Sequence, residues 1–369
     1  MREKEEKKLE KLLEEILHES ESKEELLDAR VQQLWDRVDG TLSRQEERRQ
    51  EQRRRKLRRR VSWAVAAAAV VLLAFVGLLQ MLHRDALPGM NIDHAKQLLL
   101  SHQGDTGDQI LLITGEDSIN VEGDFAEIEH RGGEQISINQ ELVEKKKEDA
   151  EQVELLRLIV PKGKRSFVKL SDGSTLWVNS GSRLVYPAEF TGEKREIYLD
   201  GEIYGDIASV PGKSFSVHTE RMEVTVLGTE LNVQAYSSDE SDAVVLVSGS
   251  VEVKPDNAGA AGARLLTPGK MAVVEEETIL VSTVNVEDYT SWKEGHYRFK
   301  NEPLANVTKR LSRYYGVDIE CSSEAGLLKC SGGIFLQDDL KDVLDGLAIS
   351  LPITIEKRDN SYYIYTKMN

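Results

Sequence analysis

The clearest hydrophobic pattern along the chain is an uncharged run, VSWAVAAAAVVLLAFVGLLQML, at residues 61–82. A helix that rises about 1.5 Å per residue would be long enough here to cross a hydrocarbon core of about 30 Å. The segment before it, RRRKLRRR at residues 53–60, is strongly basic, and the residues after it are nearly neutral. We therefore predict one transmembrane helix over 61–82, with the N-terminus cytoplasmic and the C-terminus exported. A signal peptide is the alternative, but its apolar core is shorter and starts nearer the N-terminus.

Residues 1–52 show apolar positions at three- and four-residue spacing, which predicts amphipathic helices. So short a region cannot bury two apolar stripes by itself, so the helices either pair as a hairpin or oligomer seam, or dock on a cytosolic partner. For a partner contact we expect an aromatic anchor among aliphatic side chains. The residues we predict for that contact are Leu13, Ile16, Leu17, Leu34 and Trp35.

After the apolar run, residues 83–154 predict a linker with a short helix and then a β-rich lead-in, in which 141–154 is a charged loop. Residues 155–256 alternate apolar and polar positions between turn dipeptides, which predicts an all-β domain, sandwich-like or solenoid-like. Within it, Asp172-Gly173 closes a hairpin that places Leu176 and Val178 on one face and Trp177 on the other. The other turn dipeptides are Ser180-Gly181, Asp200-Gly201, Pro211-Gly212, Ser248-Gly249 and Pro268-Gly269.

The C-terminal part changes pattern. Residues 257–291 predict a β extension and connector, and 292–369 predict a small α+β domain in the order helix, strand, strand, helix, strand, strand. Asn301 is the expected cap of its first helix, and a hairpin turning at Asp359-Asn360 closes the domain. We expect the edge strand of that hairpin to accept a strand from a partner protein; its residues are Tyr362, Tyr363, Ile364 and Tyr365.

Charge narrows the function. The formal net charge is −16, and residues 1–60 hold 18 basic against 16 acidic side chains, so the remainder holds 30 against 48. An acidic exported part argues against direct nucleic-acid binding. The seven histidines lack ligand spacing, and no acid/base pair or phosphate-binding glycine loop stands out. We therefore expect no metal, no cofactor and no enzymatic turnover.

An ordered series of motifs resembles the FecR family of membrane-spanning anti-sigma factors, in the form common in Bacteroidota, where a second signalling-type domain follows the FecR domain. The motifs are IVPKGKRSFVKLSDGSTLWVNSGSRLVYP (159–187), REIYLDGE (195–202), SFSVHTERMEVTVLGTELNVQAY (214–236), VLVSGSVEV (245–253), LTPGKMAVV (266–274) and YTSWKEGHYRFKNEPLANVTKRLSRYYGVDI (289–319).

The resemblance implies a single-pass inner-membrane sensor. Its C-terminal domain would contact the periplasmic signalling domain of an outer-membrane TonB-dependent transporter of the SusC type. Its cytoplasmic helices would bind an extracytoplasmic-function sigma factor and so control nutrient-uptake genes. Periplasmic and intramembrane proteases are further expected partners. The alternative from another class is a membrane-anchored periplasmic glycan- or cell-wall-binding module, which would need an aromatic stripe on the β domain.

Two sites allow more than one interpretation. Some FecR-like sensors resemble self-cleaving proteins in which a threonine attacks the preceding glycine carbonyl, so Gly228-Thr229 is either a cleavage junction or a packed strand turn. Cys321 and Cys330 form a disulfide if their strands lie side by side in an oxidising compartment, and otherwise stay free thiols.

Overall fold

The computed structural model describes residues 90–101, 107–115, 117–131, 135–144, 154–256 and 262–367, together with Lys11 and Glu14, which are helical and exposed. The predicted helices of 1–52, the basic segment 53–60 and the apolar run 61–82 otherwise lie outside the described residues, as do all five predicted partner-contact residues. Across the ranges just given, no helix combines the length and apolarity needed to cross a bilayer. The chain divides into two units, Met1–Asp85 and Ala86–Asn369, and the second holds the fold described below.

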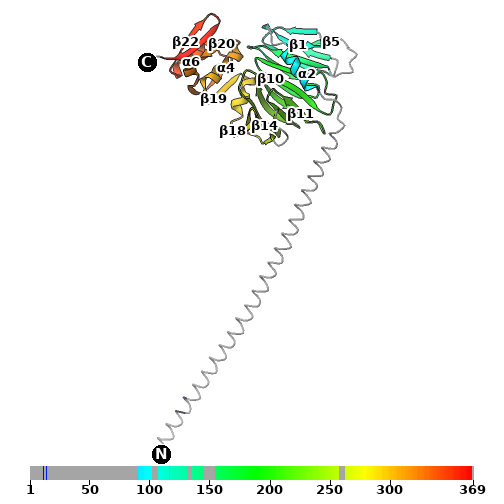
Figure 1. Ribbon diagram of the computed structural model, residues 1–369, viewed down its shortest axis with the longest axis horizontal. Coiled ribbons are helices and arrows are strands. Elements are labelled where there is room, and N and C mark those ends of the chain that lie inside the picture. The colour runs from blue at the N-terminus through cyan, green and yellow to red at the C-terminus, as the bar shows by residue number, and fades with distance from the viewer. Residues whose placement is uncertain are drawn as a thin grey trace, which may run out of the picture. The chain divides into compact units, whose positions relative to one another are not determined.

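Most of the second unit is β-structure, which confirms the predicted all-β region (Figure 1). Eighteen strands of the described chain form one large curled sheet: β1 (Ile110–Thr114), β2 (Asp117–Val121), β3 (Phe125–His130), β4 (Gln135–Ile138), β5 (Glu141–Glu144), β6 (Leu155–Val160), β7 (Arg165–Lys169), β8 (Thr175–Val178), β9 (Ser182–Pro187), β10 (Arg195–Ile207), β11 (Phe215–His218), β12 (Met222–Val226), β13 (Thr229–Ala235), β14 (Asp242–Ser248), β15 (Val251–Pro255), β16 (Arg264–Leu266), β17 (Lys270–Glu275) and β18 (Thr278–Thr283).

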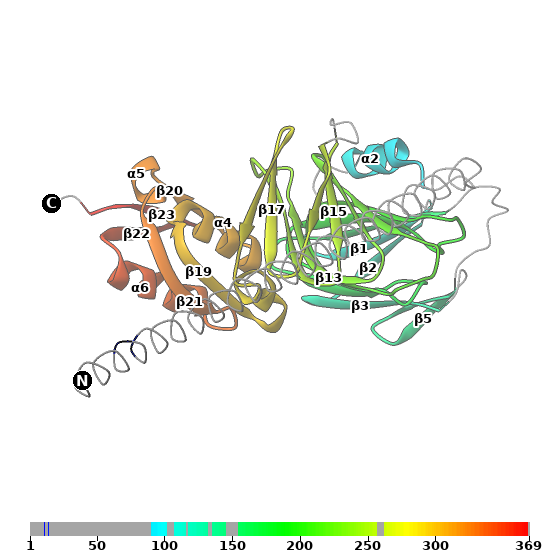
Figure 2. The same cartoon turned by 90° about the horizontal axis from the view of Figure 1, so that it is seen from below.

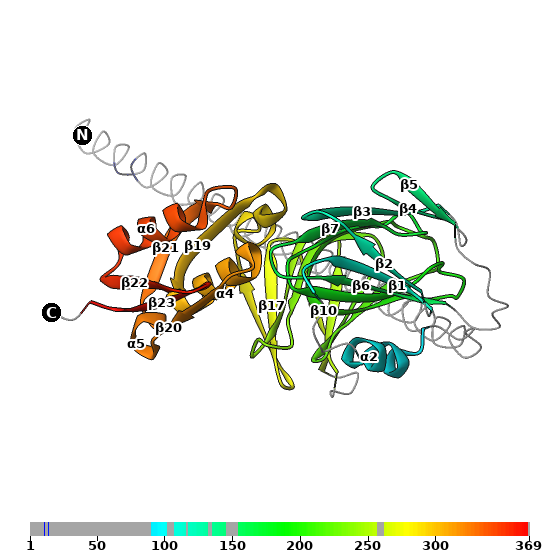
Figure 3. The same cartoon turned by 90° about the horizontal axis from the view of Figure 1, so that it is seen from above.

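The sheet curls into two layers that share the long strand β10. The first layer runs β2-β1-β6-β9-β10-β11-β12-β15-β16. The second runs β5-β4-β3-β7-β8-β10-β13-β14-β17-β18. Alternate apolar side chains of both layers meet in one buried core. Figures 2 and 3 show helix α2 (Ile92–Leu100) on the outer side of the layer that holds β1 and β6.

Gly201 lets β10 pass from one layer to the other. Residues before it pair with β9 and β11, and residues from Gly201 onward pair with β8 and β13. Its φ is +143°, and a Cβ there would lie 2.5 Å from the Cα of Ser182. The prediction of a turn at Asp200-Gly201 was therefore wrong, because here the glycine permits a close backbone approach inside a strand.

The hairpin prediction for the Asp172-Gly173 turn is confirmed. Lys169 of β7 pairs with Thr175 of β8, and Leu176 and Val178 are fully buried while Trp177 is half-buried. The charged loop predicted over 141–154 was wrong in its first four residues, which form β5 and pair with β4. The local run of charges hid the period-two pattern there.

The predicted α+β character of the C-terminal part is also confirmed. After α3 (Glu287–Thr290) and a 3-10 turn (Ser291–Glu294), the chain forms β19 (His296–Pro303), α4 (Leu304–Tyr315), β20 (Asp318–Cys321), α5 (Ser323–Gly326), β21 (Lys329–Phe335), α6 (Leu340–Ser350), β22 (Ile353–Arg358) and β23 (Ser361–Thr366). β19 pairs with β21, and a second sheet has the order β20-β23-β22. Asn301 does not cap α4; it sits in a bulge of β19 with φ 52°, and α4 starts after Pro303 without a side-chain cap.

Candidate functional site

Helix α4 is seated on the β layers by a cluster of polar contacts, here called the α4 seat. Its apolar face, Leu304, Val307 and Leu311, is fully buried in the C-terminal core. Its other face carries the cations Lys309, Arg310 and Arg313, which point toward the strands. The helix ends at Gly316 in the left-handed conformation, the usual helix stop. An amphipathic sequence thus directs one face of α4 to its own domain and the other to the β layers.

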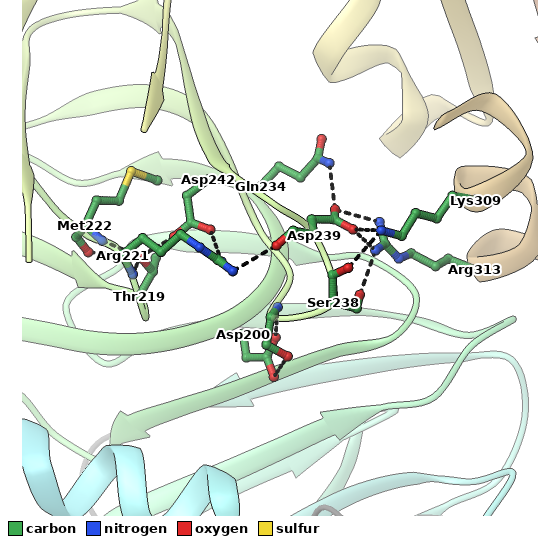
Figure 4. Close-up of polar contacts among 11 residues, drawn as sticks. Asp200, Thr219, Arg221, Met222, Gln234, Ser238, Asp239, Asp242, Lys309 and Arg313 are labelled. Carbon is green, nitrogen blue, oxygen red and sulfur yellow. Dashed lines mark hydrogen bonds and ion pairs between the residues drawn. The ribbon is translucent and has the colours of Figure 1, made fainter. Parts of the chain in front are cut away.

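Asp239 receives two of these cations (Figure 4). It lies in the short loop between β13 and β14. Arg313 Nη1 donates to its Oδ2 at 3.1 Å, and Lys309 forms an ion pair with the same carboxylate. Burial disfavours the charged carboxylate, but hydrogen bonds from Arg313 and Lys309 more than offset this, so the pKa of Asp239 lies below its usual value. Ser238 adds its carbonyl as an acceptor for Lys309 and its hydroxyl oxygen for Arg313.

The loop itself is held from the strand side. Arg221 Nη2 donates to the carbonyl of Asp239 at 2.8 Å and Nη1 to Asp242 at 3.0 Å, and Thr219 also donates to Asp242 at 2.7 Å. Asp242 is fully buried, and this desolvation raises its pKa despite those donors. The carboxylate that meets α4 is therefore placed by a second, buried charge pair (Figure 4).

The end of α4 packs closely on the β domain. The Arg313 guanidinium lies 3.7 Å from the centre of the Tyr236 ring, and the Tyr236 hydroxyl donates to the carbonyl of Ser180 at 2.9 Å. The backbone N–H of Gly163 donates to the carbonyl of Arg313 at 2.8 Å. A Cβ on Gly163 would lie 3.5 Å from Gly316, so the two glycines allow the backbones to meet.

A chain of hydrogen-bonded polar side chains joins the two parts beside the helix. Asn179 and Asn232 both donate to the Glu202 carboxylate, at 2.8 and 3.0 Å, and the Trp292 indole donates to Asn232 at 2.9 Å. All these groups except Asn179 are buried. Buried polar groups that satisfy one another specify a single arrangement, so this chain fixes the orientation of the C-terminal part.

Arg310 completes the seat. It contacts Gln234 at 3.3 Å and lies 5.1 Å from the Tyr297 ring. Although burial acts against the charge, Tyr297, Glu302 and Glu202 raise the pKa of Arg310 above its usual value. The adjoining cavity measures about 40 Å³, room for a few water molecules at roughly 10–15 Å³ each and not for an organic ligand. The residues of the α4 seat therefore serve to dock helix α4 on the β layers.

The structure distinguishes between a disulfide and two free thiols at the two cysteines. Cys321 and Cys330 are free thiols, because β20 and β21 belong to different sheets. Cys321 lies 3.3 Å from the Thr308 hydroxyl, and Cys330 is buried. The condition for the predicted disulfide, adjacent strands, is not met.

Gly228-Thr229 lies at the turn between β12 and β13. A Cβ on Gly228 would come within 2.7 Å of Ser209, and one on Gly249 would come within 2.8 Å of the Gly228 carbonyl oxygen. Thr229 is buried, and its hydroxyl donates to the carbonyl of Ser250 at 3.1 Å. Close packing therefore accounts for the glycines at 228 and 249; cleavage at the Gly228-Thr229 bond remains a prediction.

The predicted partner strand Tyr362–Tyr365 was wrong as an edge. β23 is the middle strand of its sheet; it pairs with β22 over all four of these residues and with β20 as far as Ile364. A closing hairpin read from sequence does not reveal that β20 pairs with its last strand in parallel.

Sequence reasoning missed the α4 seat. The cations at positions 309, 310 and 313 share the polar face of a predicted helix, and that spacing was the available signal. Their partner could not be found from sequence, because Asp239 lies in a polar loop, SSDES, that has the composition of an ordinary turn.

The model of FecR protein matches residues 157–282, and the model of the FecR C-terminal domain matches 296–364. Two crystal structures of a protein described as a putative anti-sigma factor from Parabacteroides distasonis ATCC 8503, at 1.65 and 2.50 Å resolution, are similar to this chain at 28% identity with a TM-score of 0.54. The matches cover 57% and 58% of this chain and 99% and 100% of those chains. No curated protein matches the chain.

These matches define a regulator of the class that pairs a β domain with a small α+β C-terminal domain. The chain belongs to the FecR family of anti-sigma factors, so the resemblance noted in the sequence is confirmed. The α4 seat lies between the two matched regions, and its residues come from both: Asn179, Glu202, Asn232 and Asp239 from the first, and Lys309, Arg310 and Arg313 from the second.

Proposed function

We propose that the protein is a single-pass inner-membrane sensor that relays a signal from an outer-membrane TonB-dependent, SusC-like transporter to an extracytoplasmic-function sigma factor. The family supports a sigma-factor partner. The basic segment 53–60 before the apolar run 61–82 supports a cytoplasmic N-terminus. In this arrangement the helices of residues 1–52 bind the sigma factor, and residues 83–369 are periplasmic.

The observation that carries the proposal is the α4 seat. A sensor must pass a contact made by its outermost domain on to the rest of the chain. Here the C-terminal domain is joined to the β layers through Asp239, Arg313 and the buried chain from Glu202 to Trp292. A partner that pulls on or reorients the C-terminal domain would act directly on the β layers.

The transporter contact is best proposed at the groove between β21 and α6. It has a volume of about 520 Å³ and is lined by Val343, Leu347 and Leu351 from one side and by β21 from the other. β21 pairs with β19 alone among the described strands, so its other edge offers backbone groups to an added strand. The α4 seat and this groove use different elements, so both contacts can exist together.

Sigma-factor binding is tested with the full-length tagged chain, purified from membranes in detergent. We expect an extracytoplasmic-function sigma factor to co-purify with the wild type and to be lost at least tenfold with Leu17→Asp or Trp35→Ala, because each removes an apolar anchor. The matched control is Lys11→Asp, which places the same acidic group on the polar face of the helical stripe. Equal recovery of the sigma factor with Leu17→Asp and wild type would reject the proposed contact.

One observation favours the alternative, a glycan-binding module. Phe125, Phe167 and Trp177 form a row across β3, β7 and β8, with ring centroids 5.9 and 5.3 Å apart at Trp177. Trp177 also packs on the C-terminal core, so part of the row serves domain docking. If the protein is a glycan-binding module, Phe125→Ala should abolish its retention on insoluble cell-wall glycan, and no sigma factor should co-purify with it. If the protein is a sensor, Phe125→Ala should co-purify with as much sigma factor as the wild type does.

A further inference from the structure

Strand β18 forms an unprotected edge of the second layer. It pairs with β17 along its whole length, and no register links its other side to a strand of the described chain. None of its six residues, TILVST, is charged. Leu280 and Val281 are 57% and 48% exposed and, as neighbours in a strand, point to opposite faces. Such an edge is a template for pairing with another strand.

The other three edges of the two layers are protected differently. β2 carries Asp117, β5 carries Glu141 and β16 carries Arg264. Charged side chains on an edge strand discourage pairing with another chain. Because β18 has neither a charge nor a proline, its edge is the one that the sequence leaves open to a partner strand.

The two ends of β18 have opposite chemistry. At its start, Glu275 pairs with Thr278, so Glu276 and Glu277 form the tip of the β17–β18 hairpin, and all three glutamates are exposed. Glu276 has φ 52°, a conformation usually given to glycine or asparagine. The three like charges repel one another, so an opposite charge brought to the tip would stabilise it.

A basic groove lies at the other end of β18. It has a volume of about 720 Å³ and is lined by Thr283, Val284 and Asn285 together with Arg298 and Lys300. Lys270 lies beside it and donates to the Thr283 hydroxyl at 2.6 Å.

Two acidic groups share the groove region. Asp288 lines it, and Glu287 pairs with Arg298 at 2.8 Å. Lys300 and Lys270 have no salt bridge among the described residues, so positive charge remains for an incoming acidic group.

We propose that the β18 edges of two copies of this chain pair antiparallel about a two-fold axis. A two-fold perpendicular to the sheet requires registers centred on a residue, here Leu280 or Val281. In the register centred on Leu280, Glu277 of one copy lies opposite Thr283 of the other. In the register centred on Val281, it lies opposite Asn285. Either register brings the acidic tip of each copy to the basic groove of the other, and this complementarity occurs twice in the dimer.

A second copy fits this edge better than an unrelated strand. The β18 edge has no charged side chain that would make it specific for a different partner. Pairing with a second copy, in contrast, places acidic side chains against basic ones at both ends. Pairing also covers the exposed Leu280 and Val281 of both copies and satisfies both sets of edge backbone groups.

Cysteine cross-linking in native membranes tests the pairing with the full-length chain. In a background carrying Cys321→Ser and Cys330→Ser, Leu280→Cys or Val281→Cys should give a disulfide-linked species of twice the chain mass under mild oxidation. The matched control is Leu142→Cys, on edge strand β5 and 58% exposed, which should stay monomeric. Cross-linking of the control to the same extent, or a product containing a different protein, would overturn the proposal.

Charge exchange tests the orientation independently. Glu276→Lys with Glu277→Lys, and Lys300→Glu alone, should each raise the dimer dissociation constant of the detergent-purified chain at least tenfold in sedimentation experiments. Combining all three changes should recover most of the affinity, because the charges are then reversed on both sides. All three positions are exposed, and an unchanged thermal melt establishes that each variant is folded. A dimer indifferent to these charges, or a wild type monomeric at every concentration, would refute it.

Discussion

Single residues decide how tightly the two layers and the two domains meet. Gly201 is the sharpest case, because its missing side chain leaves the space that the Ser182 backbone occupies. Asp239 is the second, because one carboxylate receives both Lys309 and Arg313. Neither role could be predicted from sequence, since both depend on residues far along the chain that only the tertiary fold brings near.

Gly201→Ala should destabilise the β domain by about 3 kcal/mol, since the new methyl group would overlap the Ser182 backbone and φ +143° is strained for alanine. Urea unfolding followed by circular dichroism measures the change. Gly173→Ala is the matched control: its φ is also positive, at +86°, but nothing lies within 4 Å of the new Cβ, so we expect a loss of only about 1 kcal/mol. Equal losses would contradict this account of Gly201.

Docking of α4 should weaken in acid. The pKa of Asp239 is lower in the folded protein than in the unfolded chain, so its stabilising contribution is complete above about pH 5 and is lost as the pH falls below about 4, through the folded value. The protection of the α4 amides against hydrogen exchange, taken relative to the intrinsic exchange rate at each pH, should therefore fall in that window.

Asp239→Asn provides the control for this pH effect. Asp242 acts in the opposite sense, because its raised pKa makes the ionised form costly as pH rises through the folded value. The asparagine variant removes the Asp239 contribution and keeps that of Asp242. An equal loss of protection in acid in the variant would show that Asp239 is not its source.

At the scale of elements, local patterns predicted the regular hairpins and helices well. The turn at Asp359-Asn360 joins β22 and β23 as expected, and α4 and α6 follow their apolar periodicity. The failures are elements whose pairing is set by distant strands. β10 continues through Asp200-Gly201 because both layers pair with it, and β23 is internal because β20 joins it in parallel.

Helix α6 offers a test of the groove. Gly346 lines it, and no atom lies within 4 Å of an added Cβ. Gly346→Ala should stabilise the domain by roughly 0.5–1 kcal/mol, because alanine is the better helix former, while signalling persists. Gly346→Arg should keep the fold but fill the groove and abolish transporter-dependent transcription in a reporter strain. Normal induction with the arginine variant would exclude the groove as the transporter contact.

At the scale of the whole molecule, the contacts of the α4 seat hold the β layers and the C-terminal domain together. Asp239→Arg should release the C-terminal domain, because it places a third cation against Lys309 and Arg313. We expect faster limited proteolysis in the connector at residues 284–295. Asp239→Arg combined with Arg313→Asp should slow cleavage again, since the charge pair is re-formed in reverse. Cleavage of both variants at the wild-type rate would mean that the carboxylate does not hold the domains together.

The strand shared by both layers also bears on how the chain folds. The first half of β10 needs β9 and β11, and the second half needs β8 and β13, so pairs separated by up to about thirty residues must form around it. Closing such loops has an entropic cost before the contacts stabilise anything, and folding dominated by non-local pairs is slow. The first layer cannot be completed until Leu266 of β16 has emerged, and the second not until Thr283 of β18. The nascent β domain is therefore exposed to proteases and chaperones until the last strand of each layer has been made.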